Sequence, residues 1–196
     1  MNAALAPSPP ETRLPPAKRK VRIATASLAG CFGCHMSFAD IDLRLLQLAQ
    51  WVEFDRSPLT DLKTVHPCDI ALIEGGVCNA ENVEVLRAFR RAATILVAVG
   101  ACAINGGLPA QRNSHDVAKL LTHVFERDRN LAHGSHVPND PELPLLLAHV
   151  HPIHEIVRVD YFLPGCPPTA EVIWKALTEL LAGELPSLPY PIIRYD

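Results

Sequence analysis

The first two cysteines of the chain, Cys31 and Cys34, form a C-x-x-C-H motif in the stretch AGCFGCH. This spacing occurs where haem is attached covalently in c-type cytochromes, in redox-active dithiols, and in half of a zinc or iron–sulfur site. Two single cysteines follow at a distance, Cys102 in VGACAING and Cys166 in LPGCPP. The chemistry open to the thiols therefore depends on whether the fold brings the single cysteines to the pair.

The elements that must position these thiols can be predicted from the hydrophobic pattern. Four apolar or β-branched runs are expected to be strands: 21–27, 69–76, 94–100 and 155–163. One amphipathic helix is expected from the spacing of Phe38, Ile41, Leu45, Leu48 and Val52. Other helices are expected after the second strand, around 117–124, and after Cys166, with Gly183 placed to end the last one.

This alternation predicts an α/β fold, a three-layer flavodoxin-like parallel sheet with helices on both faces. The nearly all-apolar run 94–100 is expected to be a central strand. The chain of 196 residues is long enough for one domain with a substantial core, which we place at residues 21–183. Within it, residues 127–154 are rich in Pro, His and Asn and predict a long irregular insertion.

Both ends of the chain are rich in proline. Residues 1–20 contain five prolines and end in a basic cluster, so we expect a flexible or docking N-terminal arm. A secretory signal would place its basic residues before an apolar stretch, and the order here is the reverse. Residues 184–196 are expected to form a Pro-rich C-terminal tail that packs as an extended strap.

Composition argues against several classes of partner and location. The net charge of −3 gives no general attraction to nucleic acid or to an anionic membrane. The longest strongly apolar run, 92–104, has 13 residues and is too short to cross a bilayer. We therefore expect a cytoplasmic protein, in which cysteines serve metal binding or catalysis more often than disulfides.

Four of the six cysteines follow predicted strands. Cys31 and Cys34 come after the first strand, Cys102 after the third and Cys166 after the last. Because ligands collect outside the carboxyl ends of parallel strands, these four thiols are predicted to meet at one edge of the sheet. Cys68 precedes its strand and is excluded, whereas Cys78 follows the stretch EGG on the same edge and competes as a ligand.

Several cofactors could use such an edge. A c-type haem would leave Cys102 and Cys166 without a role, as would a thioredoxin-like dithiol, and structural zinc usually takes two close ligand pairs. A [4Fe–4S] cluster takes four thiolates, often as a close pair with distant singles. Its sulfurs also accept backbone N–H groups, which requires close approach of the chain. The pattern favours a [4Fe–4S] cluster, and glycines stand beside the cysteines: Gly30, Gly33, Gly100 and Gly165.

The motifs CFGC, IEGG, GACA and LPGCPP, in this order, resemble the small subunit of [NiFe] hydrogenases. Within that family, the stretch RIATASLAGCFGCHMSFADID resembles the small subunits of the soluble, bidirectional, NAD-reducing kind. The resemblance covers about residues 21–183. It implies that Cys31, Cys34, Cys102 and Cys166 bind the proximal [4Fe–4S] cluster, while a partner large subunit holds the Ni–Fe centre.

The resemblance also implies partners. Many small subunits of the family have an export signal and a C-terminal extension with two more clusters. This chain shows neither pattern, so we expect one cluster and a diaphorase module, with FMN, further Fe–S clusters and the nucleotide site, as the next electron carrier. The implied function is that of an electron-transfer subunit of a cytoplasmic NAD-reducing [NiFe] hydrogenase. An FMN on this subunit itself is an alternative that a flavodoxin-like sheet offers, although the cysteine pair occupies the loop that would cradle its phosphate.

One related alternative is the cluster-bearing subunit of respiratory complex I, in a membrane-associated oxidoreductase. It shares the GCPP loop, but its first two cysteines are adjacent, whereas here two residues separate them. The spacing therefore favours the hydrogenase interpretation.

Other polar residues could act near this edge. Glu74 ends an apolar strand, where a carboxylate is costly unless it is paired, so we expect it to order an interface or relay protons. His35 is expected to bond a cluster sulfur or to face a partner. The histidine-rich stretch 149–155 is interpreted as an interface loop, with a metal site as the alternative.

Overall fold

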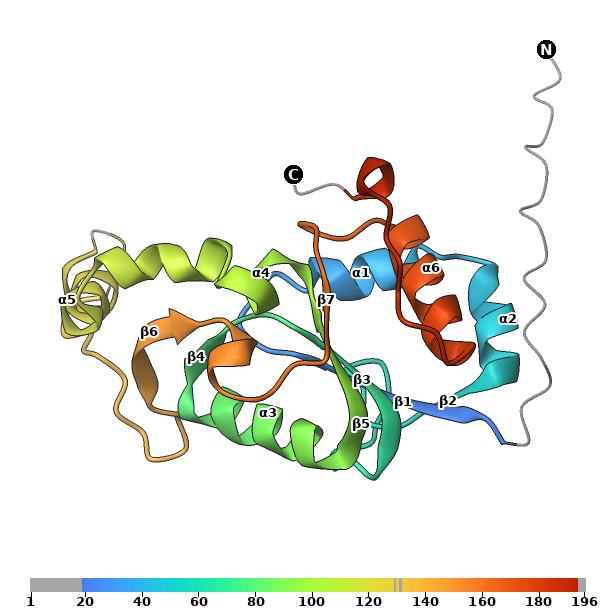
Figure 1. The fold of residues 1–196 in the computed structure, drawn as a ribbon. Helices are drawn as coiled ribbons and strands as arrows, with labels where there is room; N and C mark the ends of the chain where they lie inside the picture. The colour runs from blue at the N-terminus through green and yellow to red at the C-terminus, as the bar shows by residue number, and fades with distance from the viewer. Residues whose placement is uncertain (1–18, 129, 131, 194–196) are drawn as a thin grey trace, which may run out of the picture.

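The computed structural model describes residues 19–128, 130 and 132–193. The predicted arm over residues 1–20 therefore lies outside the described residues, apart from its last two positions. A five-stranded parallel sheet forms the centre (Figure 1), with strand order β2-β1-β3-β5-β7. Its strands are β1 (Val21–Ser27), β2 (Val52–Phe54), β3 (Cys68–Glu74), β5 (Ala93–Val99) and β7 (Tyr161–Leu163).

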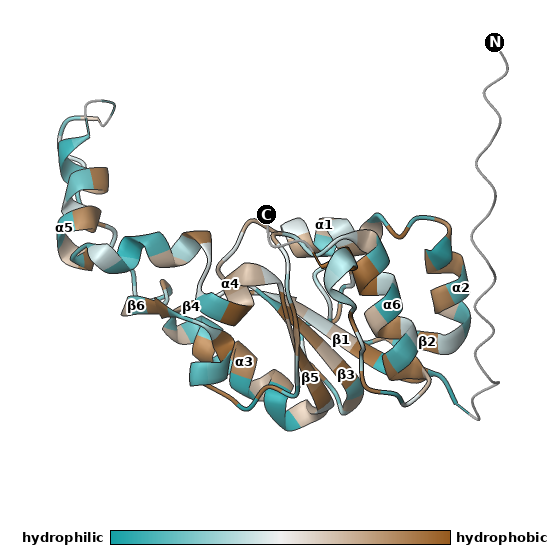
Figure 2. Cartoon of the chain, turned by 45° about the horizontal axis from the view of Figure 1, so that its top comes forward, coloured by the Kyte–Doolittle hydropathy of each residue, from teal (hydrophilic) through white to brown (hydrophobic). Residues whose placement is uncertain are grey.

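Helices cover both faces of this sheet, which confirms the three-layer α/β prediction. One face packs against α1 (Gly33–Ala39), α2 (Arg44–Trp51) and α6 (Ala170–Leu181). The other face packs against α3 (Ala80–Ala92), whose Leu86 and Phe89 are fully buried. Figure 2 shows the hydrophobic residues concentrated on the strands between these layers.

The strands alternate between the two cores, as the two-residue period of a strand requires. Ile23 and Ile70 belong to the core beneath α2 and α6, whereas Ala24 and Ala71 belong to the core beneath α3. The strand predicted to be central, β5, is an interior strand beside β3, which lies in the middle of the sheet. In the part of the chain that the structure describes, no helix is long and apolar enough to span a membrane.

The prediction of one helix from Phe38 to Val52 is wrong. The chain forms two helices, α1 and α2, because Asp42 adopts a φ of 57°, which a right-handed helix cannot include. Val52 belongs to the edge strand β2, whose three residues are too few to show a strand period. The apolar residues still reach one core, since Phe38, Leu48 and Val52 pack in the same cluster.

The last strand is shorter than predicted. Only residues 161–163 of the run 155–163 pair with β5, and Ile153–Glu155 form a 3-10 turn. Asp160 interrupts the run, because its carboxylate accepts the Leu96 N–H at 2.8 Å and pairs with Arg90 at 2.5 Å. The backbone N–H of Asp160 also donates to the carbonyl of Leu96 at 2.9 Å, so the contact with β5 begins at Asp160 and the strand follows directly after it.

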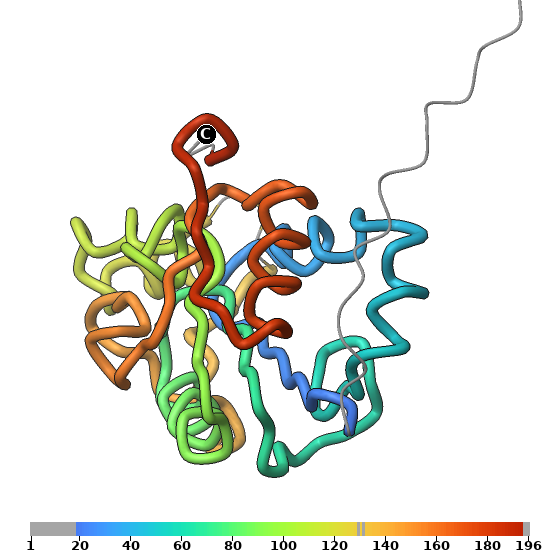
Figure 3. The backbone as a smooth tube through the Cα atoms, turned by 45° about the vertical axis from the view of Figure 1, so that its right-hand side comes forward, coloured from blue at the N-terminus to red at the C-terminus, as the bar shows by residue number. Residues whose placement is uncertain are grey.

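Residues 127–154 are not wholly irregular. Strand β6 (Leu146–His151) pairs antiparallel with β4 (Val77–Asn79) and forms a second, small sheet. Before it, the chain runs through α4 (Gly100–Asn105), a 3-10 helix η1 (Leu108–Ser114), α5 (Val117–Thr122) and a π-helical turn (His123–Arg127). Helix α6 ends before Gly183 as predicted, and the tail then runs back beside α6 (Figure 3), where Leu188 and Ile192 contact the core.

Candidate functional site

The four predicted cysteines line one recess at the carboxyl edge of the sheet. The register explains this, because Ser27, Glu74 and Val99 pair across neighbouring strands and Val99 pairs with Leu163. Four strands thus end at one level, and the loops that follow them share an edge. Cys31 and Cys166 are exposed, whereas Cys34 and Cys102 are half-buried, and all four are free thiols.

Backbone hydrogen bonds tie these loops to one another. The N–H of Ala101, next to Cys102, donates to the carbonyl of Gly165, next to Cys166, at 2.8 Å. On the other side, Ala29 and Gly76 exchange two backbone hydrogen bonds of 2.9 and 2.8 Å. These bonds join the Cys102 loop to the Cys166 loop, and the segment before Cys31 to the turn after β3, along the rim of the recess.

Glycines make room for the sulfurs. Gly100 has a φ of +83°, and a Cβ at this position would overlap Cys34 Sγ. At Gly107 a Cβ would lie 2.9 Å from Cys102 Sγ, and at Gly33 it would lie 3.1 Å from Cys31 Sγ. Side chains at these positions would fill the space around the thiols, so the rim fits a group that the sulfurs surround.

The electrostatics of the thiols are consistent with iron ligation. Burial raises the pKa of Cys34 above its ordinary value, and the charge of Glu74 raises it further. Burial likewise raises the pKa of the Cys102 thiol. Without a nearby cation, these two half-buried thiols stay protonated. With Cys31 and Cys166 they make four free thiols, which is the donor set of a [4Fe–4S] cluster, whose irons stabilise the thiolate form.

The spacing does not suit one metal ion. No three side chains of Cys, His, Asp or Glu within residues 19–128, 130 and 132–193 are grouped for a single ion. A mononuclear zinc site would draw its sulfurs to about 2.3 Å from one point. A cubane binds each thiolate through a different iron, so its ligands stand farther apart.

Glu74 lies under the rim with 3% of its surface exposed. Its carboxylate accepts the backbone N–H of Cys34 at 2.9 Å and pairs with Nδ1 of His35 at 2.8 Å. Burial raises the pKa of Glu74, but the bonds from His35, Ser27 and Cys34 outweigh it and hold the pKa below its usual value. The expectation of a buried, paired carboxylate is confirmed. Its role at an interface or in proton transfer stays a prediction.

The expectation that His35 bonds a cluster sulfur or faces a partner is wrong. Its ring is 7% exposed and bonds Glu74 through Nδ1 and Thr25 Oγ1 through Nε2, at 2.8 Å each. It also stacks on the ring of Phe32, with centroids 4.7 Å apart. Helix α1 starts at Gly33, so His35 and Phe38 share its inward face. The ring therefore supports Glu74 and reaches neither a sulfur nor a partner.

The remaining two cysteines do not line the recess. Cys68 is buried at the start of β3, on the opposite edge of the sheet, as expected. Cys78 lies in β4, which leaves the rim to pair with β6, and its thiol bonds Asn82 Oδ1 at 3.3 Å. Cys78 is therefore not a fifth ligand of the recess.

The histidines of 149–155 bond locally. His151 Nδ1 pairs with Glu155 at 2.7 Å, and the rings of His149 and His151 meet edge to face. Their part in an interface stays a prediction.

Two residues near the rim, Arg112 and Asn113, make structural hydrogen bonds that no sequence pattern predicts. The side-chain amide of Asn113 donates to Val150 O at 2.9 Å and accepts from Val150 N at 2.7 Å. Arg112 donates to the carbonyls of Cys78 and Leu147 at 3.1 and 2.7 Å. Both residues fasten η1, which follows the Cys102 loop, to the β4–β6 sheet. They could not be found without knowing that β6 exists.

The family model described as NADH ubiquinone oxidoreductase, 20 Kd subunit, matches residues 31–180. The delta subunit of the NAD-reducing hydrogenase HoxS from Cupriavidus necator is 43% identical over 180 residues, which are 90% of this chain and 86% of the relative. The chain belongs to this family, among the small subunits of NAD-reducing hydrogenases.

Other relatives agree with this family. One subunit of the F420-non-reducing hydrogenase vhu from Methanocaldococcus jannaschii is 35% identical, over 88% of this chain and 60% of the relative. A chain in the crystal structure of an NAD+-reducing [NiFe]-hydrogenase in the H2-reduced state is 82% identical. Its TM-score is 0.90, and the match covers 91% of this chain and all of that chain. A [NiFeSe]-hydrogenase of Dm. baculatum, 17% identical with a TM-score of 0.52 over 88% of this chain and 68% of that one, shares the fold.

Proposed function

We propose that this chain is the electron-transfer small subunit of a cytoplasmic NAD-reducing [NiFe] hydrogenase, and that Cys31, Cys34, Cys102 and Cys166 ligate its single, proximal [4Fe–4S] cluster. One observation supports the ligand set above all: four thiols from three separate loops line one recess. The likeness to the Cupriavidus necator subunit supports the assignment to an oxidoreductase that acts on H2 and NAD+.

A [4Fe–4S] cluster, when bound, would accept and release single electrons. The chain's own part is to place and shield it. The half-buried pair, Cys34 and Cys102, lies on the inner side of the recess, and the exposed pair, Cys31 and Cys166, lies toward the surface. Hydrogen bonds to sulfur and burial set the potential of such a group. The glycines around the thiols leave room for the backbone to approach the sulfurs of such a group.

The Ni–Fe centre, on this proposal, belongs to a large subunit that covers the rim. Met36 and Leu108 stand near the cysteines in sequence and are 57% and 67% exposed. Exposed apolar side chains of this kind suit a permanent interface. Electrons would leave toward a diaphorase module that carries FMN and further Fe–S clusters, since the Cupriavidus necator relative is a subunit of an NAD-reducing hydrogenase.

A second function has one observation in its favour, the description of the matching family model as a subunit of NADH ubiquinone oxidoreductase. A complex I-like subunit would co-purify with membranes and show no H2-dependent NAD+ reduction. The assembled complex should instead reduce NAD+ with H2 in the absence of membrane.

The ligand set is tested by serine substitution in the anaerobically purified complex. Cys166→Ser and Cys102→Ser should each lower the iron content by about one to four atoms per complex, because a cubane that loses one of its four thiolates holds its irons less firmly. Cys78→Ser and Cys68→Ser are matched controls, since both thiols lie outside the recess. Full iron content in the first two variants, or equal loss in the controls, would contradict the assignment.

A further inference from the structure

The loop that carries Cys166 contains few backbone hydrogen-bond donors. It spans residues 164–168, between β7 and the N-cap of α6, and three of its five residues are prolines, which have no N–H. Two of these prolines, Pro167 and Pro168, directly follow Cys166. The position of this thiol therefore depends on hydrogen bonds that other elements donate to the carbonyls of the loop.

Among the described residues, hydrogen bonds from two other elements reach residues 164–168. Before Cys166, the carbonyl of Gly165 accepts the backbone N–H of Ala101 at 2.8 Å. After it, the carbonyl of Pro168 accepts the hydroxyl of Ser37 at 2.5 Å. The first bond comes from α4 and the second from α1, so the loop is attached to a different helix on either side of the thiol.

The hydroxyl of Ser37 serves this contact between distant parts of the chain. A serine within a helix commonly bonds a carbonyl one turn earlier, whereas Ser37 bonds one that is 131 positions away. The N-cap residue of a helix supplies the carbonyl of the first helical bond, and the N-cap of α6 is Thr169. The carbonyl of Pro168 lies one residue earlier, outside that ladder. Since this bond is buried, loss of the hydroxyl would leave the carbonyl without a donor.

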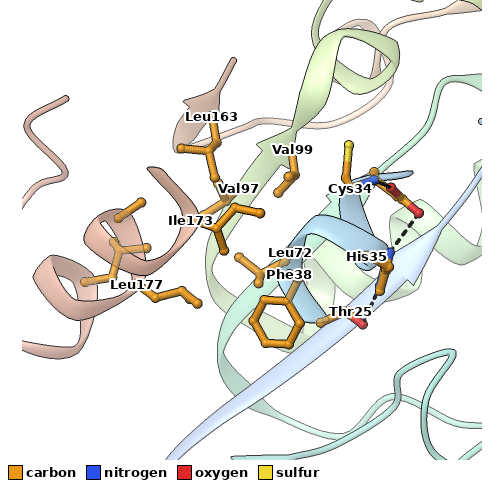
Figure 4. Close-up of a pocket in the computed structure, with 13 residues that line it drawn as sticks. Thr25, Cys34, His35, Phe38, Leu72, Val97, Val99, Leu163, Ile173 and Leu177 are labelled. Atoms are coloured by element: carbon orange, nitrogen blue, oxygen red, sulfur yellow. Dashed lines mark hydrogen bonds and ion pairs between the residues drawn. The ribbon is translucent and has the colours of Figure 1, made fainter. Parts of the chain in front are cut away.

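The packing of α1 on α6 holds Ser37 at this place. Ser37 itself is 7% exposed. The next residue, Phe38, points into the core, where Figure 4 shows it lining the same space as Ile173 and Leu177 of α6. These three apolar side chains belong to one core cluster. The apolar contacts thus bring the two helices together, and the Ser37 hydroxyl fixes the residue before the N-cap of α6.

The prolines after Cys166 also lie close to the other cysteine loops. A Cβ added at Gly33, beside Cys34, would lie 4.0 Å from Pro167 Cγ. A Cβ added at Gly100 would lie 3.7 Å from Pro168 Cδ. A shift of these prolines would therefore change how the last loop sits against the others.

We propose that Ser37 is a positioning residue for Cys166. Its bond to Pro168 ties the last cysteine loop to the helix that carries Cys34, and so it sets the distance between these two thiols. This role rests on the proposed function, because the distance between the thiols matters to a cluster that both of them ligate. Groups around the ligands of a metal centre orient them and tune the metal, and Ser37 acts in this way without touching the cluster.

Ser37→Ala in the anaerobically purified complex tests the proposal. A chelator of ferrous iron should remove iron about threefold to tenfold faster than from the wild type, as expected for the loss of one hydrogen bond. The electron paramagnetic resonance spectrum of the reduced complex should show shifted g values for one cluster, which a loss of stability alone would not produce. Ser135→Ala is the matched control, because its hydroxyl also donates to a carbonyl, that of Ala132 at 2.8 Å, but within one exposed turn.

Ser37→Thr keeps the hydroxyl and should restore the wild-type rate and spectrum. Assembly of Ser37→Thr but not of Ser37→Ala would also support the proposal. Failure of both variants to assemble would overturn it, because the volume of the side chain would then be the requirement. A wild-type spectrum in Ser37→Ala, or the same changes in Ser135→Ala, would overturn it as well.

The iron content of Cys166→Ser separates this proposal from the proposed function. Full iron content in Cys166→Ser contradicts the ligand set itself. Loss of iron in Cys166→Ser together with a wild-type spectrum in Ser37→Ala removes only the role of Ser37.

Discussion

The carboxylate of Glu74 accepts the backbone N–H of Cys34 at 2.9 Å. This bond joins the end of the central strand to the first turn of α1, and it fixes the position of one thiol in the recess. Glu74 is therefore a positioning residue for the cysteine rim, whatever further part it has.

Glu74→Gln separates positioning from proton transfer. The amide keeps the shape of the side chain, but its NH2 group can only donate, whereas the wild-type carboxylate accepts the backbone N–H of Cys34 and bonds the ring of His35. We therefore expect the unfolding free energy to fall by about 1–3 kcal/mol. Chemical denaturation of the purified chain measures this. If hydrogen oxidation by the complex kept its wild-type pH profile between about pH 6 and 9, a proton relay through Glu74 would be excluded and positioning would remain.

Gly100→Ala tests the close approach of the backbone to Cys34. The new Cβ would overlap Cys34 Sγ, so the complex should lose iron and the chain should unfold more easily. Gly134→Ala is the matched control, because Gly134 has a similar φ of +88° but nothing within 4 Å of the added atom. The control should keep its full iron content and lose only about 1 kcal/mol of unfolding free energy, the cost of a positive φ for alanine. Equal iron loss in both variants would refute the steric argument.

Asn113→Asp tests the clamp behind the Cys102 loop. The carboxylate can still accept the Val150 N–H but cannot donate to the Val150 carbonyl, so η1 and β6 should separate more often. Faster hydrogen exchange of the Val150 amide is the expected result. Asn139→Asp, at an exposed position in the same region, adds the same charge and should leave that exchange rate unchanged.

Asp160, which directly precedes β7, is expected to make the free energy of unfolding depend on pH. Burial raises its pKa, but the bonds from Arg90 and Leu96 prevail and lower it below the ordinary 3.8. A lowered carboxyl pKa gives stability that is complete above the ordinary value and is lost as the pH falls through the folded value. Asp160→Asn should therefore have a lower free energy of unfolding than the wild type at neutral pH. The difference between the two free energies should narrow below about pH 4. Urea denaturation measures this difference, and a difference that did not change with pH would show that the ion pair adds nothing to the stability of the chain.

The cysteine rim could be predicted because it depends only on which residues follow which strands. Cys31, Cys34, Cys102 and Cys166 all follow strands of the parallel sheet, and the carboxyl ends of parallel strands fall on one edge. The β4–β6 pair could not be predicted, because β4 has three residues and its partner lies far away in a proline-rich stretch. The same holds for His35, whose direction depends on where α1 begins.

The break between α1 and α2 shows a similar limit. The apolar spacing of Phe38, Leu48 and Val52 fits one long helix, and all three do reach one core. The left-handed backbone at Asp42 is a local choice that no apolar period reveals. The hydrophobic periodicity therefore predicts correctly which side chains are buried. It does not predict that the helix is broken at Asp42.

Diffraction from the assembled complex at the iron absorption edge shows whether the four thiols surround one iron–sulfur cluster. We expect an anomalous iron signal in the recess, bonded to the sulfurs of Cys31, Cys34, Cys102 and Cys166. A recess without iron, or any of these sulfurs directed elsewhere, would contradict the proposed ligand set.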